Sequence, residues 1–335
     1  MNFVDLNFTA EFIGERQALP PFLGPTLRGA FGYLLKRTVC QVAHGQCDRC
    51  LLKNVCPYTV IFEGIPPEGR PVMRKYPRVP QPFVLRSSWG DRADEDRRFS
   101  WGVRLFGIAT RYWPYVIHVF RLATEAGIGR QRVRSKIVEV SDGVGAPAFW
   151  TGDESEWRDP LVQTISSVPA QLPERCTLRW QFYTPVQIVR DGKAVGTRLD
   201  GLDLLLAGRR RWGVMNAFYG TPLEAKDDPD VRFDRSDFVT HFNGLRHWNI
   251  SRYSGRQERK VELHGVVGEI VVEGPWGLAG DWLQAIPKLH IGKSVSFGLG
   301  AVEWSVVAKV EQPVIADTEI EKIESPSHDI DLATL

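Results

Sequence analysis

A run of eleven residues near the C-terminus, from His290 to Gly300, combines residue types that could handle a phosphate group. Gly292, Gly298 and Gly300 would let the backbone approach a ligand closely and present N–H groups to phosphate oxygens. Lys293 adds a cation, and His290 could carry a proton near neutral pH. The run indicates either a phosphate-binding loop or a tight turn without a ligand.

Two common nucleotide-binding patterns do not fit this run. A P-loop needs a glycine five residues before Gly292, where Pro287 stands. A dinucleotide fingerprint needs a third glycine at the position of Glu303. The run therefore has to be interpreted together with the rest of the chain.

Four of the five cysteines lie close together in the sequence, with the spacing C-x6-C-x2-C-x5-C: Cys40, Cys47, Cys50 and Cys56. In a cytosolic chain such a cluster favours a metal site over disulfides. Structural Zn²⁺ is the first expectation, because four thiolates close its tetrahedron. An iron–sulfur cluster is the alternative, since Cys56 precedes Pro57, and four unligated thiols are a third.

Composition and charge limit the classes of function. A hydrophobic share of 43% and a charged share of 24% are typical of a soluble globular protein. The N-terminal sequence lacks the pattern of a signal peptide and no apolar run is long enough to cross a membrane, so we expect a cytoplasmic protein. The net charge of +2 divides into −6 for residues 311–335 and +8 for the remainder. We expect an acidic disordered tail and a body suited to a polyanionic partner.

The elements that must position these residues follow from hydrophobic periodicity. Alternation from Val4 to Phe12 predicts a strand, and apolar residues at helical spacing from about Thr26 predict a helix. Gly29 and Gly32 lie off or beside the apolar face of that helix, where each costs about 1 kcal/mol relative to alanine, so close packing or an approaching ligand is expected. The other elements predicted for this half are strands near 58–62, 82–87 and 99–107, a helix at 113–126 and a strand at 133–140.

The second half also combines strands and helices and can be read as the same kind of unit. Its pattern predicts a strand at 177–189, helices at 199–213 and 236–248, a strand at 261–273, a helix at 279–286 and a last strand at 295–310. The order β-α-β-β-α-β is typical of a ferredoxin-like domain. We therefore predict an α+β protein with domains at 1–150 and 173–310, joined by a linker within 141–172 that is rich in Gly, Pro, Asp and Ser.

Four motifs in a fixed order resemble a known family. They are Leu27-Arg28-Gly29-Ala30-Phe31-Gly32, the cysteine loop, Trp248-x3-Arg252-Tyr253-Ser254-x-Arg256-Gln257 and the closing run. Over about residues 3–310 this set resembles the CRISPR-associated endoribonucleases of the RAMP superfamily that process precursor CRISPR RNA. It looks most like their cysteine-containing branch.

The resemblance implies two tandem ferredoxin-like (RRM-like) domains with the glycine-rich loop packed where the domains meet. It also implies cleavage of repeat RNA without a catalytic metal. The ribose 2′-OH attacks the adjacent phosphate and leaves a 2′,3′-cyclic phosphate and a 5′-OH. Such a reaction needs a proton acceptor, a proton donor and a cation for the phosphorane-like charge.

Three residues are candidates for proton transfer: His290 at the mouth of the glycine-rich loop, His44 just after the first helix, and Tyr33 on that helix. The candidates for RNA contact are Arg28, Arg252, Arg256, Gly292, Lys293, Gly298 and Gly300. Arginine can hold phosphates bidentately and stack on bases. We expect His118 to lie in the core, His241 and His247 to support a helix, and His264 to support a strand.

The expected partners are CRISPR repeat RNA or mature crRNA, with other CRISPR effector subunits as a further possibility. The alternative function is a non-catalytic RAMP subunit that binds crRNA and scaffolds an effector complex. Intact processing after joint substitution of His290, His44 and Tyr33, or no processing at all, would favour this alternative.

Overall fold

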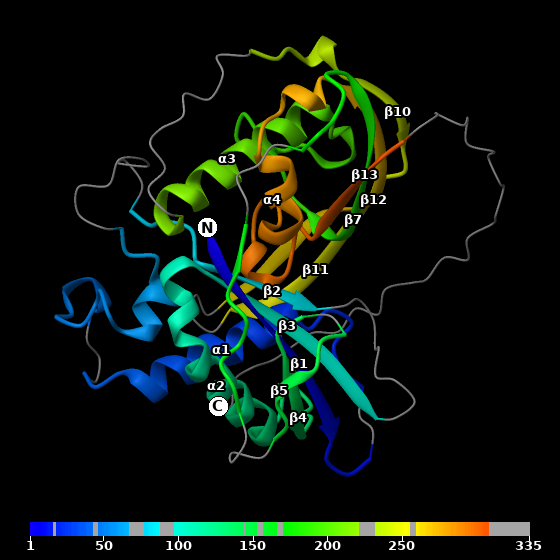
Figure 1. Cartoon of the computed structure of the whole chain (residues 1–335). Helices are drawn as coiled ribbons and strands as arrows, with labels where there is room; N and C mark the ends of the chain where they lie inside the picture. The colour runs from blue at the N-terminus through cyan, green and yellow to red at the C-terminus, as the bar shows by residue number, and fades with distance from the viewer. Residues whose placement is uncertain are drawn as a thin grey trace.

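The computed structural model of this chain describes residues 1–15, 18–42, 46–66, 77–87, 97–143, 145–152, 157–165, 170–220, 232–254 and 259–307. They form two antiparallel sheets, each packed against two helices, one in the lower and one in the upper half of Figure 1. Among these residues no helix is both long and apolar enough to cross a membrane.

The first sheet has the order β2-β3-β1-β4-β5, with β6 also paired to β1. Its elements are β1 (Asn2–Phe12), α1 (Gly24–Val39), β2 (Phe83–Ser87), β3 (Arg98–Phe106), α2 (Trp113–Ala126), β4 (Ser135–Ser141), β5 (Ala148–Trp150) and β6 (Gln163–Thr164). The order β1-α1-β2-β3-α2-β4 with the first strand central is the ferredoxin-like arrangement. The sheet thus extends beyond residue 150 through β6.

Alternation along β1 fixes which face of this sheet carries the helices. Phe8 faces α1 and α2, stacks on Trp101 with ring centroids 5.0 Å apart, and contacts Phe120 of α2. The residues between these core positions, such as Phe3 and Asp5, point to the opposite face. That opposite face is the one that meets the second domain.

The second sheet has the order β10-β12-β7-β13, with β11 also paired to β12. Its elements are β7 (Cys176–Val186), α3 (Gly201–Tyr219), β10 (Val239–Asn243), β11 (Arg246–Ser254), β12 (Arg259–Gly274), α4 (Trp282–Leu289) and β13 (Val302–Val306). A small hairpin, β8 (Val189–Arg190) with β9 (Lys193–Ala194), follows β7. Two tandem ferredoxin-like domains in an α+β fold are therefore confirmed.

Tryptophans fill the core of the second domain. Trp180 of β7 stacks on Trp282 of α4, with centroids 6.1 Å apart, and also contacts Trp276. Gly208 of α3 lies against Trp282 so closely that a Cβ at residue 208 would overlap the indole ring. This core continues into Phe3, Val84 and Phe106 of the first sheet, so the two domains share apolar packing.

Short helical turns complete the described structure. They are η1 (Cys47–Arg49), the π-helical η2 (Thr59–Glu63), η3 (Gly107–Tyr112), η4 (Gly196–Arg198), η5 (Arg235–Asp237), η6 (Trp276–Leu278) and η7 (Val295–Phe297). The strand predicted near 58–62 is wrong, because this segment continues helically from Cys56, whose carbonyl accepts the N–H of Val60 and the hydroxyl of Thr59.

The helix predicted at 236–248 is also wrong. Asp234 and Asp237 form a capping box, but only the 3₁₀ turn η5 follows it. Val239, Thr240 and Phe242 then pair with β12, as β-branched and aromatic residues favour. His241 and His247 therefore lie on strands and not on a helix.

The last strand begins later than predicted. Residues 295–297 form η7, and Gly298 and Gly300 have φ angles of 87° and 79°, which an extended strand excludes. Only from Val302 does the chain pair with β7.

Candidate nucleic-acid interface

The glycine-rich loop joins α4 to β13, and most of its backbone bonds stay within the protein. The N–H of Lys293 donates to Gln187 O at 3.0 Å, and that of Gly300 to Pro185 O at 2.9 Å. The N–H of Ile291 donates to Gly300 O at 3.0 Å, which closes the loop on itself. These N–H groups anchor the loop to the protein. The side chain of Lys293 is exposed and provides a cation on the outer surface of the loop.

The glycines permit close backbone contacts in this loop. A Cβ at Gly292 would lie 2.6 Å from Gln187 O, and one at Gly300 would overlap Ile291 O. Both have positive φ angles, 88° and 79°, which side chains rarely adopt. Gly298 has a φ of 87° and lies beside Leu85 of β2. The three glycines hold the shape of the loop, and their contact with RNA stays a prediction.

The loop docks on the start of α1. Gly24 lies directly against the carbonyl of Phe297, where a Cβ would overlap it. Arg28 donates from Nε to Ser296 Oγ at 3.2 Å and from Nη2 to Gln81 Oε1 at 3.1 Å. Its guanidinium lies 4.2 Å from the centroid of the Phe297 ring, a cation–π contact. Arg28 therefore joins the two domains, in addition to its predicted contact with RNA.

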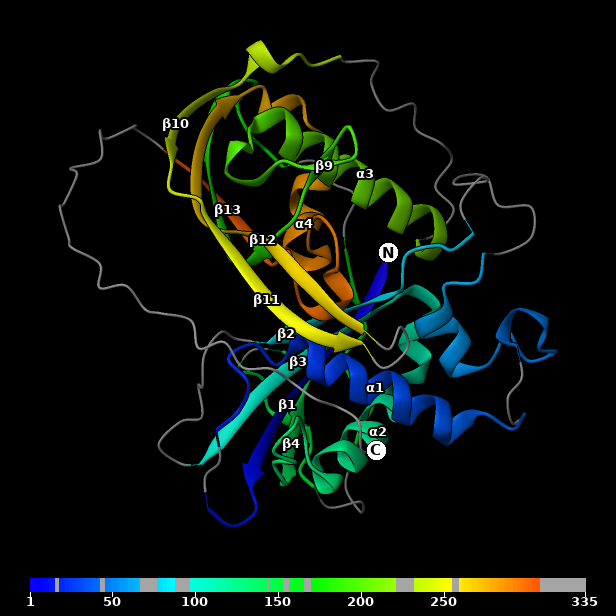
Figure 2. The same cartoon turned by 180° about the vertical axis from the view of Figure 1, so that it is seen from behind.

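The β11–β12 hairpin covers the other side of the loop. It extends beyond the second sheet toward α1, as the yellow strands of Figure 2 show. Trp248 meets Phe22 edge-on with centroids 5.8 Å apart, and Leu263 packs with Phe22 and Leu299. Arg252 lies on β11 with only its backbone described, and Arg256 lies outside the described residues.

Buried arginines hold the end of α4 just before the loop. Arg104 of β3 forms a bidentate pair with Asp5, at 2.8 and 2.7 Å, and donates from Nη1 to Lys288 O at 3.0 Å. Arg211 of α3 donates from Nε and Nη2 to Leu289 O at 3.2 and 3.1 Å. Burial lowers the pKa of Arg211 to about 10. Cations at the carbonyl end of a helix offset its dipole, so this network fixes where the loop begins.

His290 lies inside this network with only 3% of its surface exposed. Its Nδ1–H donates to Leu299 O at 3.1 Å across the base of the loop. Burial, together with the nearby charges of Arg104 and Arg86, lowers its pKa to about 3 despite that hydrogen bond. A neutral imidazole below the surface braces the loop, and this geometry argues against the proton-transfer role predicted from the sequence.

The outward face of α1 presents the accessible groups. Tyr33 is 61% exposed, and Arg37 Nη1 donates to its Oη at 3.0 Å. Gly29, one turn earlier, is exposed, and a Cβ there would meet no atom within 4 Å. Open space beside Tyr33 is compatible with an approaching RNA backbone. His44 lies outside the described residues.

Two parts of this chain match family models. Residues 180–302 match the family model of the CRISPR-associated endoribonuclease Cas6, and residues 1–158 match an N-terminal domain model, AF_1859_N. The resemblance to the CRISPR-associated endoribonucleases is thereby confirmed. The Cas6 match runs from within β7 to the first residue of β13 and includes the glycine-rich loop.

One curated relative matches in sequence, and solved structures match in fold. An uncharacterized protein of Archaeoglobus fulgidus is 28% identical over 156 residues, which is 45% of this chain and about half (48%) of the relative. A Cas6 product complex of Thermus thermophilus matches with a TM-score of 0.52 at 14% identity, over 90% of this chain and 100% of the other. A partial Cas6-RT-Cas1–Cas2 complex matches with a TM-score of 0.50 at 10% identity, over 92% of this chain and 46% of the other.

The cysteines that the sequence assigns to a metal lie in the α1–β2 connection of this Cas6-like fold. Cys40 is exposed and donates from Sγ to Val42 O at 3.1 Å, and Cys47, Cys50 and Cys56 are half-buried. Burial, Glu63 and the neighbouring cysteines Cys40 and Cys56 raise the pKa of Cys47, against a lowering by Lys36. Within the described part of the chain no three His, Cys, Asp or Glu side chains form a metal-holding group. The metal therefore stays a prediction, and no chemical step is assigned to it.

Sequence reasoning missed the residues that position the loop. Arg86, Arg104 and Arg211 point between the domains, and their distance from the loop in sequence hid them. One signal was present: an arginine between apolar residues, as in Val103-Arg104-Leu105, faces away from its own core. Such a residue indicates that the second face of the sheet is also covered.

Proposed function

We propose that this protein is an endoribonuclease that cleaves CRISPR repeat RNA within precursor transcripts to give mature crRNA. The observation that carries the proposal is the match of residues 180–302 to the Cas6 family, combined with a glycine-rich loop docked on α1. The excess of positive charge outside the acidic tail suits an RNA substrate. RNA and other CRISPR proteins are its proposed partners, in keeping with the complexes that proteins of similar fold form.

The proposed reaction is metal-independent attack of a ribose 2′-OH on the adjacent phosphate. The bond from phosphorus to the leaving 5′-oxygen breaks, which gives a 2′,3′-cyclic phosphate and a 5′-OH. Tyr33 and His44 are the proposed proton-transfer groups, and Lys293 would stabilise charge on the phosphate. His290 would act as a positioning residue through Leu299.

The test is cleavage of the repeat RNA of the protein's own CRISPR array in EDTA. We expect product with a cyclic phosphate, and no product when the nucleotide at the cut carries a 2′-deoxy sugar. Tyr33→Phe should lower the single-turnover rate by about tenfold or more, since general acid–base catalysis contributes about 10²–10⁴-fold. Leu34→Met, on the packed side of the same helix, is the matched control. Cleavage of the 2′-deoxy substrate would contradict the mechanism.

The second candidate function is a non-catalytic RAMP subunit that binds crRNA and scaffolds an effector complex. The burial of His290 favours it, because it removes one proton carrier from the RNA-facing surface. This function predicts tight RNA binding without cleavage. Unchanged processing by a variant that combines His44→Ala with Tyr33→Phe would also favour it over the proposed catalytic residues.

We also propose that the cysteine loop binds structural Zn²⁺ through Cys40, Cys47, Cys50 and Cys56. The unfolded chain rarely holds a preformed metal site, so binding of the ion contributes to folding, and the thiol ligands must lose their protons to bind it. The raised pKa of Cys47 means that binding would release a proton. Purified protein should contain one zinc per chain by mass spectrometry, and Cys50→Ser should lose it while Cys176→Ser keeps it. Iron together with sulfide would identify a cluster. Protein that contains neither zinc nor iron would refute the proposal.

A further inference from the structure

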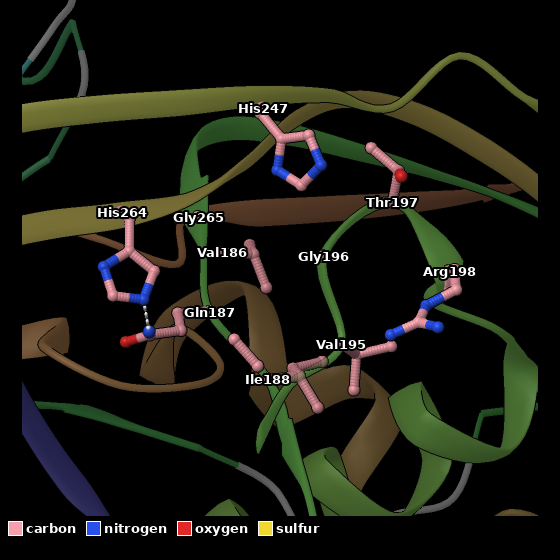
Figure 3. Close-up of a pocket in the computed structure, with 11 residues that line it drawn as sticks. Val186, Gln187, Ile188, Val195, Gly196, Thr197, Arg198, His247, His264 and Gly265 are labelled. Atoms are coloured by element: carbon pink, nitrogen blue, oxygen red, sulfur yellow. Dashed lines mark hydrogen bonds between the residues drawn. The ribbon is translucent and has the colours of Figure 1, made fainter.

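A cavity of about 300 Å³ opens beside the glycine-rich loop, between the β11–β12 hairpin and η4. Figure 3 shows the ring of His247 projecting from β11 toward the segment that carries Gly196 and Thr197, and the ring of His264 projecting from β12 toward Gln187. His247 lies opposite Val266 in the β11–β12 register, so His264 is its diagonal neighbour on the same face. The cavity thus has two imidazoles on one wall.

The remaining walls differ in polarity. Val186, Ile188 and Val195 are buried and form an apolar floor. Arg198 is exposed at the rim, and none of the described residues that line the cavity is acidic. Within the described part of the chain, the side chains of Arg198 and His247 have no hydrogen bond or ion pair. An apolar floor with unpaired donors at the rim is the lining of a ligand pocket and not of a packing defect.

Two contacts fix the shape of the cavity. The side-chain amide of Gln187 forms a hydrogen bond with Nε2 of His264, drawn as a dashed line in Figure 3. Gly196 has a φ of 63°, and a Cβ there would lie 2.8 Å from Cε1 of His247. A larger residue at 196 would push into the space below the imidazole. The absence of a side chain at residue 196 therefore leaves room for the ring of His247.

The cavity and the glycine-rich loop share one residue. Gln187 accepts the N–H of Lys293 with its carbonyl and contributes its side chain to the cavity. An RNA strand bound at Lys293 would therefore pass next to the cavity. The volume suits one base with its ribose and excludes a duplex, so a base must be unpaired to enter.

We propose that this cavity binds one unpaired nucleotide of the RNA substrate, next to the segment held at the glycine-rich loop. The base stacks between the imidazoles and the apolar floor, and Arg198 binds a phosphate at the rim. The pocket selects RNA that has a single-stranded nucleotide at this position. The inference rests on the proposed function for its substrate, but not on the cleavage chemistry.

The test measures binding of repeat RNAs that each carry one abasic nucleotide on either side of the cut, by fluorescence anisotropy. With the unchanged protein, one abasic position should weaken binding about tenfold, since stacking of a base contributes about 1–3 kcal/mol. With His247→Ala, intact RNA should bind about tenfold more weakly, and that abasic position should cost nothing further. The midpoint of unfolding in urea checks that the variant is folded.

Arg246→Ala is the matched control, because residue 246 neighbours His247 but points to the other face of β11. It should keep the full abasic effect. An equal effect of every abasic position in the His247→Ala variant and the unchanged protein would overturn the inference. So would a loss of the abasic effect in Arg246→Ala equal to that in His247→Ala.

Two further arms separate the possible causes of failure. If free nucleoside 5′-monophosphates bind in a His247-dependent way but no abasic position is coupled to His247, the pocket takes free nucleotides and the RNA assignment is overturned. If the RNA is cleaved as proposed without coupling, only the pocket inference fails. If the coupling is present but no cleavage occurs in EDTA, the pocket stands and the proposed chemistry fails.

Discussion

The two halves of this protein place a similar loop at the same point of the same topology. In the first half, α2 is joined to β4 by residues 127–134, and in the second, α4 is joined to β13 by residues 290–301. Both begin with a residue of positive φ, then a buried isoleucine, a glycine of positive φ and a basic residue: Gly127-Ile128-Gly129-Arg130 and His290-Ile291-Gly292-Lys293.

The loops differ in how they close. Ile128 and Val133 exchange both backbone hydrogen bonds at 3.0 Å, so the first loop returns to itself at once. The second has four more residues and forms η7, which packs against α1 and β2 of the other domain. The shared pattern turns the chain from helix to strand, and the added residues convert that turn into a contact between domains.

The largest expected difference concerns the glycines. Both residues have positive φ angles, but in Gly300→Ala a methyl group would overlap Ile291 O, whereas in Gly129→Ala it would meet only ordinary contacts, the nearest at 3.7 Å. We expect Gly300→Ala to lower the free energy of unfolding by about 3 kcal/mol or more, and Gly129→Ala by about 1 kcal/mol. Urea unfolding of both variants measures this. Equal losses would mean that the two loops bear the same constraint.

The next difference concerns pH. His290 stands where the first half has Gly127, and its pKa is lowered to about 3 by burial. The unfolded chain binds this proton at about pH 6.5, so the folded state loses stability as the pH falls from about 6.5 toward 3, by at most about 1.4 kcal/mol per pH unit. His290→Asn cannot titrate and should flatten the pH dependence of unfolding in that range. An unchanged slope would assign the acid sensitivity to other groups.

The docking of the second loop gives a smaller effect. Arg28→Lys keeps a charge but loses the planar group that contacts both Phe297 and Ser296. We expect a loss of about 1–2 kcal/mol in the free energy of unfolding, together with slower RNA cleavage, because the loop is less firmly held. Arg37→Lys on the exposed face of α1 is the control for stability. Full activity of Arg28→Lys would show that docking is not limiting.

The smallest effect distinguishes the two basic residues. Lys293 and Arg130 occupy matching positions, but only Lys293 belongs to the loop that docks on the other domain. Lys293→Ala should weaken RNA binding several-fold for all sequences and reduce the salt slope by about one. Arg130→Ala should change neither. Anisotropy titrations at several salt concentrations measure this, and similar slopes for both variants would make the loops equivalent RNA contacts.

Much of the fold can be predicted because alternation and helical spacing directly report which face is buried. The predicted helix at 113–126 agrees with α2 to the residue, and the first strand agrees nearly as well with β1. The helix predicted at 236–248 fails because a short segment can carry a helix start signal while its partner, β12, makes it a strand. The local sequence of this segment carries no information about its pairing with β12.

The candidate site is less predictable. The sequence marks the glycine-rich loop, α1 and Lys293, but it suggests for His290 a surface role that burial between three arginines opposes. It also places His247 on a helix, whereas His247 lines a cavity on β11. Exposure depends on the packing of one domain on the other, which periodicity within each domain does not report.

The sequence by itself determined most elements of the two ferredoxin-like units, though not the helical η2 or the strands β10 and β11, and the places where the chain turns. Both follow from local chemistry, namely the apolar periodicity of each segment and the conformational freedom of its glycines. Only the tertiary structure decided that η7 docks on α1, that His290 is buried and that a cavity lies beside Gln187. These features depend on residues far apart in the sequence, which only the packing of the two domains brings together.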